Sequence, residues 1–132
     1  MKRVPENAIQ HKTAGPYSPV LLVSDFDEIV VISGQAPLDL DGNLVGKTIE
    51  EHTIKTMENC LTQLKKAGVG FEDVFRVNVY MDDLDEWQRF NEIYKELMPT
   101  PYPARTAVGV KLLHGFKVEI DMWATKKNKE EK

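Results

Sequence analysis

The chain is poor in cysteine: Cys60 is its single one among 132 residues. An internal disulfide framework is therefore excluded, which suits a reducing compartment. The chain also lacks long apolar runs, because no stretch approaches the roughly 20 apolar residues of a membrane-spanning helix. Its first residues, Met1 to Glu6, lead into no apolar signal-peptide core. We therefore expect a globular, cytoplasmic protein without a membrane partner.

An excess of positive charge is absent too. The formal net charge is −4 and the isoelectric point is near 5.4, so overall charge does not favour nucleic acid as a partner. The three histidines, His11, His52 and His114, lie far apart, without cysteines or carboxylates at ligand spacing. We therefore expect no metal site. A G-x-S-x-G motif, a phosphate-binding glycine loop and a Rossmann fingerprint are also missing.

What the chain does contain is an alternation of strand and helix patterns. Its length favours one domain over residues 1–132. Residues 1–16 are expected to be irregular, with 1–13 as an N-terminal arm and 126–132 as a flexible charged tail. The patterns predict strands at 20–23 and 28–33, paired as a hairpin, and further strands at 74–81, 103–110 and 117–121.

Two amphipathic helices are predicted between these strands. Thr48 and Glu51 form a capping box at the start of the first, and Gly68 suits the residue after its end. Its apolar stripe, which Cys60 adjoins as a core thiol, is Ile54, Met57, Leu61 and Leu64. The second helix precedes Pro99 and carries the stripe Trp87, Phe90, Tyr94 and Leu97. The order predicts an α+β fold, a sheet with both helices on one face.

The last two strands carry the candidate chemistry. In the first, Val108 and Val110 alternate with Arg105 and Ala107, and in the second Glu119 opposes an aliphatic face. We expect the aliphatic residues to face the core. The apolar face of the strand at 74–81 is expected to be Phe75, Val77, Val79 and Met81. The face without helices would then carry Arg76, Asn78, Tyr80, Arg105, Glu119 and Trp123, and a homo-oligomer would bury it.

Arg105 is the sharpest candidate, because a guanidinium binds a carboxylate or phosphate with two parallel donors. The alternative is a structural ion pair, with Glu119 or a neighbouring chain. Glu119 is interpreted either as that partner or as a general base. Further candidates are Tyr17, Ser33, Gly34 and Asn91, for which a purely structural role is the alternative. From the residues alone, the hypothesis is an anion-binding pocket on an oligomer-covered sheet face.

Several segments together resemble the Rid (YjgF-like) family, over about residues 14–124. They are Gly15-Pro16-Tyr17-Ser18, Ile32-Ser33-Gly34-Gln35-Ala36-Pro37, Gly42-Asn43-Leu44-Val45, Asn91-Glu92-Ile93-Tyr94, Pro103-Ala104-Arg105-Thr106-Ala107-Val108 and Val118-Glu119-Ile120-Asp121. The resemblance implies a chorismate-mutase-like α+β fold with a mixed sheet, assembled as a homotrimer with clefts between subunits.

The resemblance also implies an activity: cofactor-free hydrolysis of reactive 2-imino or enamine acids, such as 2-aminoacrylate, 2-iminopropanoate and 2-iminobutanoate, to 2-oxo acids and ammonia. Arg105 would hold the substrate carboxylate and Glu119 would help to position the attacking water. The cleft would be lined by Tyr17, Ser33, Gly34 and Asn91, with Ala107 contacting the substrate through its backbone.

Two departures from the family pattern bear on activity. Ala107 stands where many deaminases have cysteine, and the loop Leu112–Phe116 is one residue shorter than usual. Two alternative functions remain open: a non-catalytic regulator that binds a 2-oxo acid, and an endoribonuclease or translation inhibitor. The negative net charge weighs against the second, because RNA binding relies on positively charged surfaces.

Overall fold

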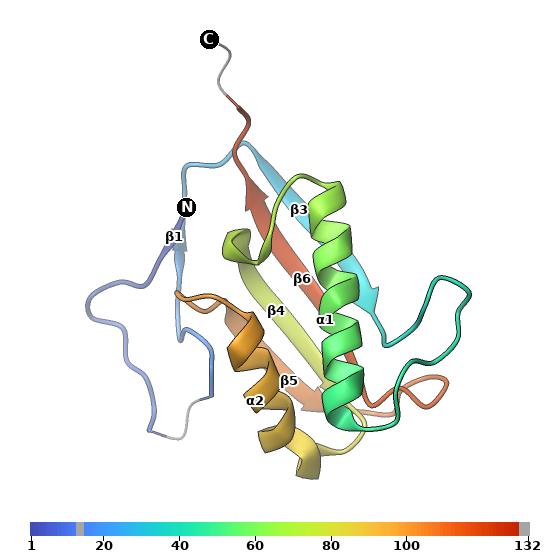
Figure 1. Cartoon of the computed structure of the whole chain (residues 1–132). Coiled ribbons are helices and arrows are strands. Elements are labelled where there is room, and N and C mark those ends of the chain that lie inside the picture. The colour runs from blue at the N-terminus through green and yellow to red at the C-terminus, as the bar shows by residue number, and fades with distance from the viewer. Residues whose placement is uncertain (13–14, 130–132) are drawn as a thin grey trace.

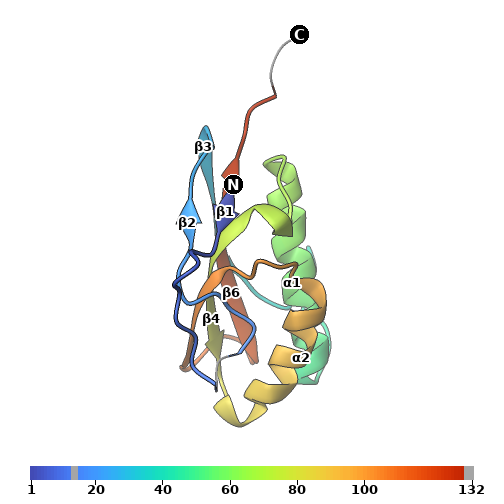
Figure 2. The same cartoon turned by 90° about the vertical axis from the view of Figure 1, so that its left-hand side faces the viewer.

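The computed structural model describes residues 1–12 and 15–129. Its centre is a four-stranded sheet in the order β3 (Glu28–Gln35), β6 (Val118–Lys126), β4 (Val74–Met81), β5 (Ala104–Gly109). β4 and β5 are parallel, whereas β6 is antiparallel to both β3 and β4. Two helices, α1 (Ile49–Lys66) and α2 (Trp87–Leu97), pack on one face of it (Figures 1 and 2). The predicted α+β fold with a mixed sheet and both helices on one face is therefore confirmed.

The start and end of α1 follow the predicted capping signals. The Thr48 hydroxyl accepts a hydrogen bond from the Glu51 amide at 3.1 Å, and the Glu51 carboxylate accepts one from the Thr48 amide at 3.2 Å. Gly68 follows the helix with φ of +86°, a conformation that favours glycine. The predicted stripe is only partly correct, because Met57 and Leu64 are buried but Ile54 is 43% exposed. The buried face instead comprises Ile49, His52, Thr53, Thr56, Met57, Cys60 and Leu64.

The helix α2 begins after a 3-10 turn, η2 (Leu84–Glu86), and presents aromatic rings to the sheet. Trp87 stacks on Phe90 with ring centroids 5.6 Å apart, and Phe90 stacks on Tyr94 at 5.7 Å. Leu97, predicted as the end of this stripe, is 40% exposed at the last turn. In the part of the chain that the structure describes, neither helix combines the length and apolar character needed to cross a membrane.

The predicted hairpin of 20–23 with 28–33 is wrong. Residues 22–23 form β2 (Leu22–Val23), which pairs with β1 (Lys2–Arg3) in a separate two-stranded sheet. β3 pairs instead with the nine-residue β6, which is long enough to satisfy the backbone groups on that side of β3. The arm is thus not wholly irregular, although residue 13, its predicted end, lies outside the described residues.

The predicted tail at 126–132 begins one residue too early, because Lys126 ends β6 and pairs with Glu28. Beyond it, the Lys127 ammonium contacts the Asp25 carboxylate at 3.1 Å. The Asn128 amide donates to the Asp27 carboxylate at 2.7 Å. Residues 130–132 lie outside the described part of the chain. A short 3-10 turn, η1 (Phe71–Asp73), connects α1 to β4.

A bulge in β4 changes which side chains face the helices. Val74 pairs with Ala124 and Arg76 with Trp123, so Phe75 is the extra residue between them. Val74 is fully buried, whereas the Phe75 ring lies edge-on to Trp123 at 6.4 Å. The prediction that Phe75 belongs to the core face is therefore wrong. Val77, Val79 and Met81 are buried as predicted.

The orientation of β5 is opposite to the prediction. Arg105 pairs with the buried Val77, and Ala107 with the buried Val79, which places both on the helix face. Val108 and Val110 are 43% and 44% exposed rather than part of the core. β5 pairs with β4 and not with β6, so the last two strands form no hairpin.

The sheet face opposite the helices is called the open face below. Among the described residues, no helix covers it (Figure 2). Here Asp121 accepts hydrogen bonds from the Asn78 amide at 2.9 Å and from the Tyr80 hydroxyl at 3.1 Å. The face also exposes large apolar side chains, Ile29, Val31, Val108 and Trp123. Arg105, which was predicted to lie on this face, is not on it, and the oligomer that would bury this face stays a prediction.

Candidate functional site

Arg105 lies beneath α2 with only 9% of its surface exposed. Its guanidinium carbon is 4.7 Å from the ring centre of Tyr94 and 4.8 Å from that of Trp87. The rings of Tyr17 and Phe90 follow at 5.7 Å and 6.0 Å. Aromatic faces attract a cation, so contacts with these rings stabilise the guanidinium in its buried, dehydrated position. They supply no hydrogen-bond acceptor to its terminal nitrogens.

No carboxylate of the described residues pairs with Arg105. Its Nη1 and Nη2 atoms are buried without a hydrogen-bond partner there, and so are Asn91 Oδ1 and the Tyr94 hydroxyl. Burial lowers the pKa of the guanidinium and raises that of Tyr94. A neutral Tyr94 hydroxyl remains a donor. A buried cation without an anion is costly, and buried polar groups almost always have partners. The arrangement therefore suits an anionic ligand with further polar atoms.

The aromatic rings of α2 form one wall of the pocket around Arg105, and the chain around Tyr17 forms the other. The Tyr17 amide donates to Gly15 O at 2.9 Å, and the Ser18 amide donates to Pro103 O at 3.1 Å. A Cβ on Gly15 would lie 3.0 Å from Arg105 Nη2 and 3.4 Å from Asn91 Nδ2. Glycine thus lets the backbone approach the guanidinium closely. Gly15 and Asn91 also line a surface pocket of about 410 Å³ beside α2.

Glu119 and Gly34 form a second cluster. A Cβ on Gly34 would lie 2.7 Å from Glu119 Oε1, so only glycine leaves room for this carboxylate position. Both residues line a pocket of about 330 Å³ together with Phe116. Asn59 Nδ2 donates to Ala36 O at 2.8 Å and to Leu38 O at 2.9 Å, which holds the wall of this pocket.

Ser33 is exposed and lines a different groove, of about 500 Å³, between β3 and α1. It is adjacent to Gly34 in sequence, yet it does not line the pocket that holds Glu119. Cys60 is fully buried, and burial raises the pKa of its thiol. It is therefore the core thiol that was predicted and not a nucleophile.

The two clusters lie apart within one chain. β4 separates β5 from β6, so Arg105 and Glu119 are two strand spacings, ~10 Å, from each other across the sheet. Arg105 pairs with Val77 and Glu119 with Tyr80, a further offset of about 10 Å along the strands. Arg105 is on the helix face and Glu119 on the open face. An ion pair between them within one chain is therefore excluded, whereas an ion pair of Arg105 with a neighbouring chain stays an alternative.

The structure thus sorts the predicted site residues into two groups. Tyr17, Asn91 and Arg105 meet under α2, and Ala107 follows on the same face of β5. Gly34 and Glu119 meet on the other side. The aromatic rings of α2 were predicted only as core. A stripe made almost entirely of aromatic residues, facing an arginine strand, is the signal that could have identified them.

The fold and these clusters define a class of protein: a small α+β domain with a buried arginine, unpaired among the described residues, under its second helix and a carboxylate on the opposite sheet face. The sequence profile of the family described as Endoribonuclease L-PSP matches residues 6–126. The mitochondrial protein mmf2 of Schizosaccharomyces pombe is 37% identical over 125 residues, covering 92% of this chain and 96% of that protein. A human protein named 2-iminobutanoate/2-iminopropanoate deaminase is 34% identical over 123 residues, covering 92% and 88%.

The fold comparison agrees with these relatives. A crystal structure from Thermotoga maritima MSB8 has a TM-score of 0.71 at 36% identity, covering 97% of this chain and 100% of that chain. Structures of Rid proteins share the same fold. The chain belongs to the Rid family, also known as the YjgF or L-PSP family.

Proposed function

We propose that this protein hydrolyses reactive 2-imino acids, formed directly or from enamine acids such as 2-aminoacrylate, to 2-oxo acids and ammonia. The observation that carries the proposal is the buried Arg105 guanidinium, which has no anionic partner among the described residues and lies beside Asn91. A 2-imino acid supplies the missing carboxylate. The name of the human relative, 2-iminobutanoate/2-iminopropanoate deaminase, supports this substrate class.

In this reaction the main task of the protein is to position the imine and the attacking water. An iminium carbon is already electrophilic, so a water held at the correct angle can attack C2. The new C–O bond gives a tetrahedral carbinolamine, and the C–N bond then breaks. The two protons of the water end on the nitrogen, which leaves as ammonium. In this proposal Arg105 binds the carboxylate, and Glu119 orients the water and moves its proton.

We also propose that the active unit is a homotrimer in which the Arg105 cluster of one subunit meets the Glu119 cluster of the next. Two observations support this assembly: the clusters are too far apart to share a small substrate within one chain, and the open face exposes apolar side chains such as Val31 and Trp123. Ala107 lies two residues beyond Arg105 and has no thiol, so the proposed hydrolysis needs none there.

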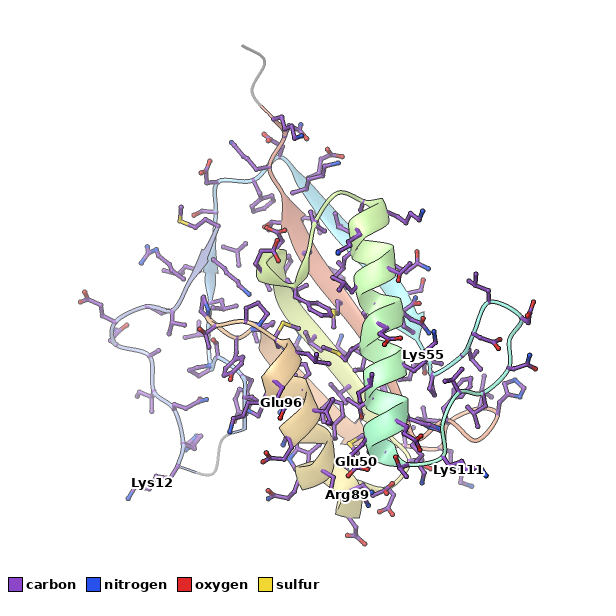
Figure 3. All side chains as sticks on the ribbon, in the orientation of Figure 1. Lys12, Glu50, Lys55, Arg89, Glu96 and Lys111 are labelled. Atoms are coloured by element: carbon purple, nitrogen blue, oxygen red, sulfur yellow. The ribbon has the colours of Figure 1, made fainter. Side chains whose placement is uncertain are left out.

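The test is to generate the imine in situ with a threonine dehydratase or an amino-acid oxidase and to measure formation of the 2-oxo acid. Wild-type protein is expected to accelerate this step over the uncatalysed rate. Arg105→Ala is expected to lose about 10- to 100-fold in kcat/KM, because it removes a charge-assisted contact worth roughly 1.5–3 kcal/mol. The matched control is Arg89→Ala. Arg89 is a surface arginine that pairs with Glu50 at 2.6 Å, and it does not line the pocket beside α2; both residues are labelled in Figure 3.

The same assay separates the other two functions. A regulator would bind 2-oxobutanoate through Arg105 without any turnover. An endoribonuclease would cleave RNA, and this cleavage would persist after a further purification step. Either result without imine hydrolysis would overturn the proposal. The cytoplasmic location stays a prediction, since the mmf2 relative is named as mitochondrial.

A further inference from the structure

The hydroxyl group of Tyr94 is a buried polar group that the fold leaves without a partner. Tyr94 is fully buried on α2, and its Oη atom forms no hydrogen bond with the described residues. In that part of the chain, five buried side-chain nitrogen or oxygen atoms have no partner, and four of them belong to Asn91, Tyr94 and Arg105. Unpaired buried groups are rare in folded proteins, so their concentration at one place indicates a ligand there.

The aromatic stack of α2 does not need this hydroxyl. Phe90 lies one turn earlier on the same helix, is equally buried, and stacks on Tyr94 with ring centroids 5.7 Å apart. A phenylalanine therefore fits this stack. The ring of Tyr94, however, is nearer to the Arg105 guanidinium carbon, at 4.7 Å against 6.0 Å for Phe90. The hydroxyl thus belongs to the ring that lies closest to the unpaired cation, where leaving it without a hydrogen bond costs stability.

The surroundings of the hydroxyl define the kind of atom that it can bind. Burial raises the pKa of Tyr94, with Arg105 acting in the opposite direction, so the hydroxyl keeps its proton at neutral pH. A guanidinium has only donors and cannot accept that proton. Tyr94 and Arg105 therefore both contribute donors to the same buried place. A carboxylate, whose two oxygens carry several lone pairs, can accept from both residues.

We propose that the Tyr94 hydroxyl is a second donor to the substrate carboxylate, alongside the guanidinium of Arg105. This inference rests on the proposed function, which places that carboxylate at Arg105. The carboxylate accepts from Nη1 and Nη2 of Arg105 and from Oη of Tyr94, and it thereby satisfies three buried atoms that have no partner among the described residues. Tyr94 is then a binding residue of the site as well as part of the core.

The experiment measures, by titration calorimetry, the affinity of wild type and of Tyr94→Phe for 2-oxobutanoate, the product of 2-iminobutanoate hydrolysis. Loss of one hydrogen bond to a charged group is expected to weaken binding about 10-fold. Butanoate, which has the carboxylate but no oxygen on C2, should be weakened by the same factor. In imine hydrolysis, KM should rise by a similar factor with kcat unchanged, because the carboxylate is bound equally in the ground state and the transition state.

A second measurement separates this binding role from a structural one. Tyr80→Phe is the matched control, because the Tyr80 hydroxyl has a partner in the protein, the Asp121 carboxylate at 3.1 Å. Denaturation in guanidinium chloride, at matched protein concentrations, should give a lower midpoint for Tyr80→Phe than for wild type. The midpoint of Tyr94→Phe should equal or exceed that of wild type, because this substitution removes a buried hydroxyl that has no partner among the described residues.

Three results would overturn the inference. One is an unchanged affinity of Tyr94→Phe for 2-oxobutanoate, and another is a lower denaturation midpoint for this variant than for wild type. The third is a weakening confined to 2-oxobutanoate, because the hydroxyl would then contact the oxygen on C2. If wild type binds both anions but hydrolyses no imine, the proposed function fails, and the affinities still decide the role of Tyr94. If wild type binds neither anion, the inference is overturned as well.

Discussion

At the scale of single residues, Arg105 is the feature that the fold itself does not explain. A guanidinium buried among four aromatic rings, with no carboxylate from the described residues, gives up hydration that cation–π contacts offset only in part. A residue chosen for stability alone at this position would be apolar. In the proposed function, the arginine is a binding group whose partner is a ligand.

This interpretation predicts how Arg105→Met behaves. The free energy of unfolding should stay unchanged or rise by about 1 kcal/mol, because an apolar side chain of similar length replaces an unpaired buried cation. Imine hydrolysis should fall by about 10- to 100-fold in the same protein, as it should in Arg105→Ala. Denaturation in guanidinium chloride, at matched protein concentrations, measures the first effect. A decrease of about 3–5 kcal/mol would instead indicate a structural ion pair.

At the scale of elements, α1 shows which signals are local. The capping box and Gly68 depend on hydrogen bonds and dihedral angles within a few residues, and both appear as predicted. The buried face depends on what packs against the helix. Met57 and Leu64 were found from their spacing, but Ile54 is exposed while His52 and Cys60 are buried. Periodicity alone did not reveal that polar and small residues form this contact.

The cap of α1 gives a second prediction. Thr48→Ala should lower the free energy of unfolding by about 1 kcal/mol, because it removes the acceptor for the Glu51 amide at the helix start. Equilibrium denaturation measures the loss. Thr62→Ala is the matched control, since the Thr62 hydroxyl donates to the Glu58 carbonyl in the exposed middle of the same helix. Equal losses in both variants would contradict a specific role for the cap.

The strand β5 shows what sequence alternation does not predict. Alternation separates Arg105 and Ala107 from Val108 and Val110 correctly, because successive side chains point to opposite faces. It does not say which face the helices cover. The aliphatic face was taken as the core, whereas α2 covers the arginine face with aromatic rings.

At the scale of the whole molecule, the two clusters lie on opposite faces of one sheet. The topology β3-β6-β4-β5 puts Arg105 on one edge strand and Gly34 on the other, with Glu119 between them on the open face. A small substrate can touch both clusters only if two chains contribute. In the proposed function, catalysis therefore requires assembly of the subunits.

Mixing two impaired variants tests this point. Arg105→Ala and Glu119→Gln chains, unfolded together in equal amounts and refolded, should recover about a quarter of wild-type activity. Random assembly makes three quarters of the trimers mixed, and each mixed ring contains one intact site of three. Imine hydrolysis measures the recovery, and each variant refolded alone is the control. No recovery, with mixed trimers shown by mass spectrometry, would place both residues in one chain's site.

The sequence by itself determined the two helices, the caps of α1, four of the main strand positions and the identity of Arg105, Glu119, Tyr17, Gly34 and Asn91 as candidates. These follow from short-range periodicity, capping chemistry and motif order. Only the tertiary structure decided that β3 pairs with β6, that Phe75 occupies a bulge, and that Arg105 lies under α2 rather than on the open face. Strand order and the choice of face depend on contacts between residues far apart in the chain, which local patterns do not encode.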